Sequence, residues 1–119
     1  MKHEELITQP GTVVSHFKRD GYIKNCSKNG IPCDKSAYLY KVVGVARHTE
    51  NEKKLVVYMA LYNMVGKYGM NISVGDLFAR PYKDFVSEVD RIKYPIEKYP
   101  DYNQQHRFEV FKSENEKLS

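Results

Sequence analysis

The sequence has 119 residues, of which 41% are hydrophobic and 29% charged, and this composition is typical of a folded globular domain rather than of a disordered chain. We expect one domain over residues 1–119, because a chain of this length can bury a single core without cross-links. It contains no apolar stretch of bilayer-spanning length, and its first residues lack the apolar run of a secretory signal, which predicts a cytoplasmic protein.

The formal net charge of +4 is unevenly distributed along the chain. Residues 1–70 contain 11 Lys and Arg against 6 Asp and Glu, whereas residues 71–119 contain 8 against 9. A basic excess of this kind favours anionic partners, although a solvated lysine-rich surface needs no partner.

Short segments rich in β-branched and aromatic residues predict a mostly β fold. In chain order, the expected strands cover residues 12–17, 38–48, 55–62, 76–80 and 106–111. The second and third are separated by a short polar stretch and predict a hairpin. Pro81 is expected to open a brief helical turn over residues 82–86, because proline is tolerated at the first helical position.

The remaining segments are expected to be irregular. Residues 20–36, 63–75 and 91–105 are rich in Gly or Pro and predict three long loops, and the polar residues 113–119 predict a flexible tail. Short strands joined by loops favour a small closed β-barrel with its core between about residues 11 and 111. The tyrosines of the third loop are interpreted as surface or packing residues.

Alternation along the second hairpin strand separates its side chains into two sets. Leu55, Val57, Met59 and Leu61 are predicted to face the core, and Val56, Tyr58, Ala60 and Tyr62 to face outward. If Gly44, Ala46 and His48 lie opposite the outward set, small residues beside two tyrosines form a shallow trough with aromatic walls.

The trough leads to a binding hypothesis. A flat, partly aromatic ligand would stack on a tyrosine while an arginine bonds to its phosphate or carboxylate. The alternative is that another segment of the chain covers the trough and the tyrosine hydroxyls bond to the backbone. The predicted ligand-binding residues are Arg47, His48, Glu50, Tyr58, Tyr62, Arg80 and Arg107.

No catalytic or metal site is predicted. His48 and Glu50 point the same way in an extended strand, so Glu50 could orient the imidazole as a general base, but the sequence offers no nucleophile motif beside them. The structural alternative is that Thr49 and Glu50 shape the turn and that Arg47 pairs with Glu50 or Asp84. Cys26 and Cys33 are expected to be free thiols, since their spacing does not fit a zinc site completed by a histidine.

Several strings of the chain resemble the bacterial and phage family called domain of unknown function 1653 (DUF1653). The resemblance covers most of residues 11–111 and is found in His16-Phe17-Lys18, in residues 40–50 and 55–62, in Arg80-Pro81 with Phe85, and in Arg107-Phe108. It implies a small SH3-like barrel and no particular activity. Phe78 stands where the family commonly has Trp, and the loops at residues 20–36 and 63–75 are longer than expected.

Together these observations predict a binding domain that is not an enzyme and needs no cofactor. Its expected ligand is anionic and contains a base: a nucleotide-like small molecule, as for a phage-type sequestering protein, or single-stranded nucleic acid. The alternatives are a peptide-interaction module, with the third loop as one wall, and a small hydrolase that uses His48 and Glu50. A homodimer is compatible with an exposed strand edge.

Overall fold

A computed structural model describes residues 1–66 and 70–112 of the chain, and it is mostly β, as the sequence predicts. Its elements are α1 (His3–Ile7), β1 (Val13–His16), α2 (Arg19–Lys28), β2 (Leu39–Arg47), β3 (Lys54–Ala60), β4 (Met64–Val65), β5 (Asn71–Ile72), β6 (Leu77–Pro81), α3 (Tyr82–Phe85) and β7 (Phe108–Val110). All five predicted strands and the helical turn after Pro81 are confirmed. The predicted tail over residues 113–119 lies outside the described residues.

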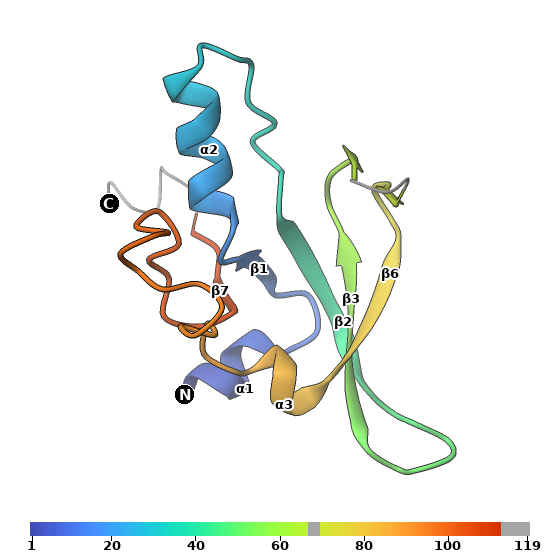
Figure 1. Ribbon diagram of the computed structural model, residues 1–119. Helices are drawn as coiled ribbons and strands as arrows, with labels where there is room; N and C mark the ends of the chain where they lie inside the picture. The colour runs from blue at the N-terminus through green and yellow to red at the C-terminus, as the bar shows by residue number, and fades with distance from the viewer. Residues whose placement is uncertain (67–69, 113–119) are drawn as a thin grey trace.

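The five predicted strands form one antiparallel sheet in the order β6-β3-β2-β1-β7 (Figure 1). The long hairpin of β2 and β3 is its centre and extends well beyond the other strands. Along this hairpin the register shifts between Val42 and Gly44, so Gly44 lies opposite Val57 and Ala46 opposite Leu55. The predicted pairing of small residues with the two tyrosines is therefore wrong.

The closed barrel that the sequence predicts is not found in the described residues. The edge strands β6 and β7 are separated by α3 and by the segment that follows it. This segment pairs with the chain entering β7, through an N–H of Arg107 that donates to the carbonyl of Ser87 (2.9 Å) and an N–H of Val89 that donates to the carbonyl of Gln105 (3.0 Å). The sheet thus remains open and curls around its core.

The core lies on the opposite face of β3 from the predicted one. Val56, Tyr58 and Ala60 are buried, while Leu55, Val57 and Met59 remain partly accessible on the outer face. Two features explain why the tyrosine face of β3, rather than the aliphatic face, is buried. Phe85 of α3 and Phe108 of β7 stack at 4.4 Å and cover the tyrosine face, whereas no helix of the described chain covers the outer face.

Two tyrosines buried in this core form a hydrogen bond between their hydroxyl groups. Tyr62 is 1% exposed, and its hydroxyl lies 2.5 Å from that of Tyr40. Burial, together with this contact, raises the pKa of Tyr40. Because a buried hydroxyl is stable only with a partner, the pair lets two polar rings occupy an otherwise apolar core.

Two of the three predicted loops contain regular structure. The segment 20–36 is largely α2, a helix with an acidic residue in its first turn and Lys28 in its last, so the prediction of a loop there is wrong. The segment 63–75 contains the two-residue strands β4 and β5, and residues 67–69 within it are outside the described part. The segment 91–105 is irregular, as predicted, and lies beside α2 (Figure 1). No helix of the described chain has the length and apolar character needed to cross a membrane.

Candidate functional site

The seven residues predicted to bind a ligand do not lie together. Arg47, His48 and Glu50 are at the tip of the β2–β3 hairpin, where Arg47 and Glu50 are exposed. The Nδ1 atom of His48 accepts a hydrogen bond from the backbone N–H of Glu50 (3.1 Å). The contact therefore shapes the turn. Within the described residues, no hydrogen bond or ion pair joins the Glu50 carboxylate to the imidazole or to Arg47.

Tyr58 and Tyr62 belong to the interior rather than to a surface trough. Tyr58 is 5% exposed and Tyr62 is 1% exposed, so neither ring offers a face to a ligand from solvent. The hydroxyl of Tyr58 instead accepts a hydrogen bond from Nε of Arg80 (3.3 Å). Tyr58 thus helps to fix the position of the Arg80 side chain from the buried side of the sheet.

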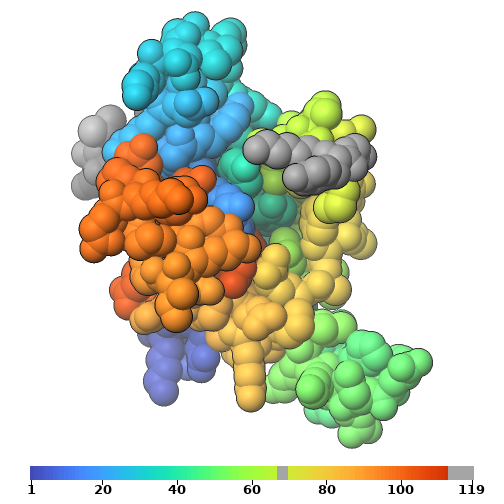
Figure 2. Space-filling model, viewed as in Figure 1, coloured from blue at the N-terminus to red at the C-terminus, as the bar shows by residue number. Residues whose placement is uncertain are grey.

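The structure brings Arg80 and Arg107 together at a hollow of about 360 Å³, which we call the basic pocket. Its walls come from β1 and the residues after it, from β6, from the irregular segment and from the chain entering β7. The lining residues are His16, Phe17, Lys18, Arg80, Asp90, Lys93, Tyr94 and Arg107. Figure 2 shows the molecule hollowed between the orange irregular segment and the yellow strand β6, with blue atoms of the N-terminal part at the bottom.

Both arginines are held through Nε, which leaves their terminal nitrogens available. Nε of Arg80 donates to Tyr58, and Nε of Arg107 donates to Oγ of Ser87 (3.4 Å). Neither guanidinium forms an ion pair within the described residues. Since terminal guanidinium N–H groups match the oxygens of a phosphate or carboxylate, the two side chains can each donate to a bound anion.

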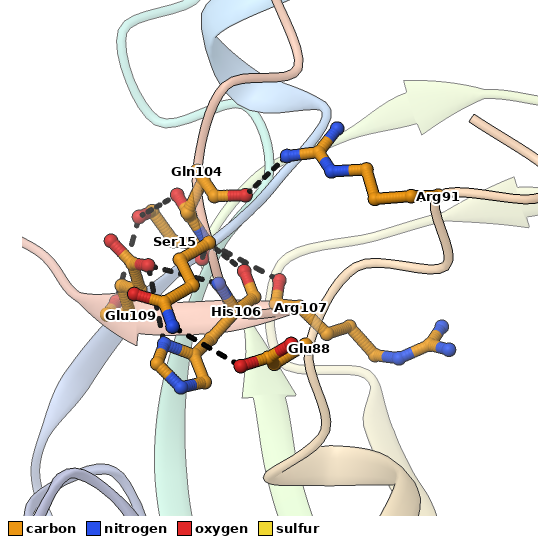
Figure 3. Close-up of polar contacts among 8 residues, drawn as sticks. Ser15, Glu88, Arg91, Gln104, His106, Arg107 and Glu109 are labelled. Carbon is orange, nitrogen blue, oxygen red and sulfur yellow. Dashed lines mark hydrogen bonds and ion pairs between the residues drawn. The ribbon is translucent and has the colours of Figure 1, made fainter. Parts of the chain in front are cut away.

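A network around Gln104 fixes the backbone from which Arg107 extends (Figure 3). The side-chain amide of Gln104 donates to the carbonyls of Ser15 (3.0 Å) and His106 (2.9 Å), and the guanidinium of Arg91 donates to the carbonyl of Gln104 (3.0 Å). The side chain of Arg107 points away from this network. The network therefore anchors the segment to β1 without using the charge of Arg107.

Two lysines converge on Tyr94 at the edge of the pocket. The Nζ atoms of Lys18 and Lys93 lie 5.3 and 5.5 Å from the centre of the Tyr94 ring. Partial burial acts to raise the pKa of Tyr94, but the two ammonium groups outweigh it and the pKa is lowered. The ring is thus surrounded by positive charge and stabilises both cations through its π face.

His16 is a neutral member of this cationic group. Its Nδ1 accepts a hydrogen bond from the backbone N–H of Lys18 (3.2 Å), so the neutral ring carries its proton on Nε2. Burial lowers the pKa of His16 to about 3, and the charges of Lys18, Arg107 and Arg80 act in the same direction. His16 can therefore donate one N–H to a ligand without adding charge.

The acidic residue that lines the basic pocket does not neutralise it. One carboxylate oxygen of Asp90 accepts hydrogen bonds from the backbone N–H groups of Ile92 (3.0 Å) and Lys93 (3.2 Å). With four cationic side chains, one carboxylate and a neutral histidine, the lining carries a formal charge of 4 − 1 = +3. The described residues hold no cluster of His, Cys, Asp and Glu suited to a metal ion.

Sequence reasoning found two of these pocket residues and missed the others. Lys18 and His16 belong to a string quoted for the family resemblance, but nothing in the string indicates that they meet Arg80 and Arg107. Tyr94 is one of the third-loop tyrosines interpreted as surface or packing residues, and Lys93 has no predicted role. A signal was present, because lysine beside tyrosine occurs twice there, in Lys93-Tyr94 and Lys98-Tyr99.

Comparison with known proteins gives one match. Residues 12–110 match the family model described as protein of unknown function (DUF1653). Neither the curated proteins nor the solved structures contain a match. The matched range includes every residue that lines the basic pocket.

Proposed function

We propose that this chain, which belongs to the DUF1653 family, is a binding domain for an anionic, base-containing ligand whose phosphate enters the basic pocket. The observation that carries this proposal is the convergence of Lys18, Arg80, Lys93 and Arg107 on one hollow. These four cations form no ion pair within the described part of the chain.

The energetics of the pocket favour an anion. Cations gathered in a partly enclosed site repel one another, and a phosphate relieves this repulsion while it accepts several charge-assisted hydrogen bonds. Each such bond contributes about 1.5–3 kcal/mol. Tyr94, which is only partly buried, supplies an aromatic contact beside the cations, which suits a ligand that also carries a base.

The same geometry supports binding rather than catalysis. Nδ1 of His16 is engaged by a backbone N–H, and its low pKa makes it a poor proton acceptor near neutral pH. Asp90 accepts two backbone hydrogen bonds. The described lining residues therefore contain no free general base beside a nucleophile. A cytoplasmic location belongs to the same proposal, because the free thiols Cys26 and Cys33 suit a reducing compartment.

Calorimetric titration with adenosine 5′-diphosphate and with adenosine tests the proposal. We expect the diphosphate to bind and adenosine to bind at least tenfold more weakly, because adenosine lacks the phosphate oxygens. Arg80→Gln and Arg107→Gln should each weaken diphosphate binding by roughly 10- to 100-fold, which corresponds to the loss of one charge-assisted contact.

Arg47→Gln is the matched control, since Arg47 is an exposed arginine of the hairpin tip and does not line the basic pocket. It should leave the affinity unchanged. Circular dichroism and the melting temperature establish that each variant is folded. Equal binding of adenosine and its diphosphate, or a loss of affinity only in Arg47→Gln, would contradict the proposed site.

A further inference from the structure

A second hollow of about 470 Å³ adjoins the basic pocket, between α2 and the irregular segment, and we call it the tyrosine groove. Figure 2 shows the blue helix α2 resting against the orange segment at this place. Four tyrosines line it: Tyr22, Tyr38, Tyr99 and Tyr102. The rings of Tyr99 and Tyr102 are parallel to within 4° and their centres are 5.2 Å apart.

The tyrosine groove and the basic pocket are neighbours. Lys18 lines both hollows. The ring of Tyr94, which lines the basic pocket, lies 5.4 Å from that of Tyr99 and 5.8 Å from that of Tyr102. A ligand that spans both hollows would therefore contact cationic and aromatic residues in each of them.

Positive charge continues along the tyrosine groove beyond the basic pocket. Lys24, Lys28 and Lys98 line the groove together with a single acidic residue, Asp101, which forms an ion pair with Lys24 (3.0 Å). Lys28 and Lys98 form no ion pair in the described residues. The groove thus offers cationic contacts for a second phosphate, separate from the arginines.

Backbone strain marks the same groove. Tyr38 has φ of +61°, a conformation that is unfavourable for a bulky side chain. Its ring contacts Tyr22 in the groove and His16 in the basic pocket, at centre distances of 6.1 and 5.7 Å. Such a conformation persists only where the surrounding structure fixes it, and here the aromatic ring that it places lies between the two hollows.

We propose, on the basis of the proposed function, that the ligand is single-stranded nucleic acid, with one phosphate in the basic pocket and neighbouring bases against the tyrosines. A mononucleotide would leave the lysines of the groove without a phosphate. A duplex keeps its bases stacked on one another, so their faces do not reach aromatic side chains. Alternating cations and rings instead suit an unpaired strand of at least two nucleotides.

Fluorescence anisotropy with labelled oligothymidylates of two, four and eight nucleotides tests the inference, with thymidine 5′-monophosphate as an unlabelled competitor. The tetramer should bind at least tenfold more tightly than the monophosphate. Tyr99→Leu should weaken tetramer binding by about tenfold, as expected for the loss of one stacking contact, and should leave monophosphate binding unchanged. Tyr82→Leu, on α3 and outside both hollows, is the matched control.

The outcomes separate the two proposals. Monophosphate binding as tight as that of the tetramer, or tetramer binding insensitive to Tyr99→Leu, overturns the single-strand inference and leaves the proposed function standing. A duplex of eight base pairs that binds as tightly as the single strand also overturns it, as does equal binding of an acidic peptide such as hexaglutamate. If neither the monophosphate nor any oligonucleotide binds and adenosine 5′-diphosphate also fails, both proposals are wrong.

Discussion

His16 lies among cations and offers a hydrogen-bond donor without adding to their charge. A protonated imidazole would add charge next to Lys18, Arg80 and Arg107, and burial also disfavours the charged form. The neutral ring avoids both costs. Its orientation is set by the N–H of Lys18, which leaves the proton on Nε2 and so defines which atom a bound anion can contact.

The low pKa of His16 predicts acid sensitivity. The unfolded chain binds a proton near pH 6.5, whereas the folded chain binds it only near pH 3, so stability falls as the pH is lowered between these values. One such group contributes a slope of about 1.4 kcal/mol per pH unit. In His16→Asn, whose side chain can accept the same Lys18 N–H, urea unfolding from pH 7 to 4.5 should show a correspondingly shallower slope.

Nuclear magnetic resonance gives an independent check on this prediction. The His16 ring signals should not titrate between pH 8 and 4.5. A titration midpoint near 6.5 for His16, or identical pH slopes for the wild type and His16→Asn, would show that the ring is not held neutral by the fold.

The sequence could predict the arginines of the site but not the positions of the tyrosines. Arginine is a strong anion ligand wherever it occurs, so Arg80 and Arg107 could be proposed from residue type alone. Tyr58 and Tyr62 were predicted as trough walls because an exposed tyrosine and a buried one look alike in a sequence. Their hydroxyl groups bond to partners distant in the chain, Arg80 for Tyr58 and Tyr40 for Tyr62, and alternation cannot reveal these contacts.

Among the elements, the positions of the strands could be predicted from the sequence. Which face of the β2–β3 hairpin is buried could not. Both faces of β3 carry large apolar or aromatic side chains, so alternation alone does not distinguish them. The aliphatic residues of β3 suggested that their face is buried. The other face is buried instead, because Phe85 and Phe108, which are distant in the sequence, pack against Tyr58. Helix α2 was missed because Gly21 and Asn25 are poor helix formers, although Asp20, Lys28 and the following Gly30 are ordinary helix-end signals.

Gly21 is also where α2 meets the tyrosine groove, and this contact gives a prediction. A Cβ atom at position 21 would lie 2.6 Å from Cε1 of Tyr102. Gly21→Ala should therefore lower the free energy of unfolding by about 1 kcal/mol, because an overpacking cost of about 1–3 kcal/mol exceeds a gain in helix propensity of about 1 kcal/mol. Denaturant unfolding measures the change.

Ser27→Ala is the control for helix propensity, since Ser27 is exposed on the same helix. It should raise the stability by a few tenths of a kcal/mol, opposite in sign to Gly21→Ala. Ring signals of Tyr102 should shift in Gly21→Ala and not in Ser27→Ala. Two stabilising variants of similar size would mean that α2 does not pack closely on Tyr102.

On the scale of the whole molecule, the fold brings together positively charged residues that are far apart in the sequence. The N-terminal basic excess predicted an anionic partner, but residues from both halves of the chain form the basic pocket. The irregular segment is central to this arrangement. It contributes Lys93 and Tyr94 to the pocket and Lys98, Tyr99 and Tyr102 to the tyrosine groove, and it places them against β1 and α2.

This charge distribution predicts a strong salt dependence for the binding of a single strand. Each phosphate neutralised on single-stranded nucleic acid contributes about −0.7 to the slope of log K against log salt. Contacts with about two phosphates, one at each hollow, give a slope of about −1.4, so octathymidylate should bind about 7-fold more weakly at 200 mM than at 50 mM salt. Lys98→Gln should make the slope shallower by about 0.7, because one phosphate contact is lost, whereas Lys53→Gln in the hairpin turn should not change it. Anisotropy titrations at four salt concentrations measure both slopes. An affinity independent of salt would mean that phosphate contacts at the two hollows do not hold the strand.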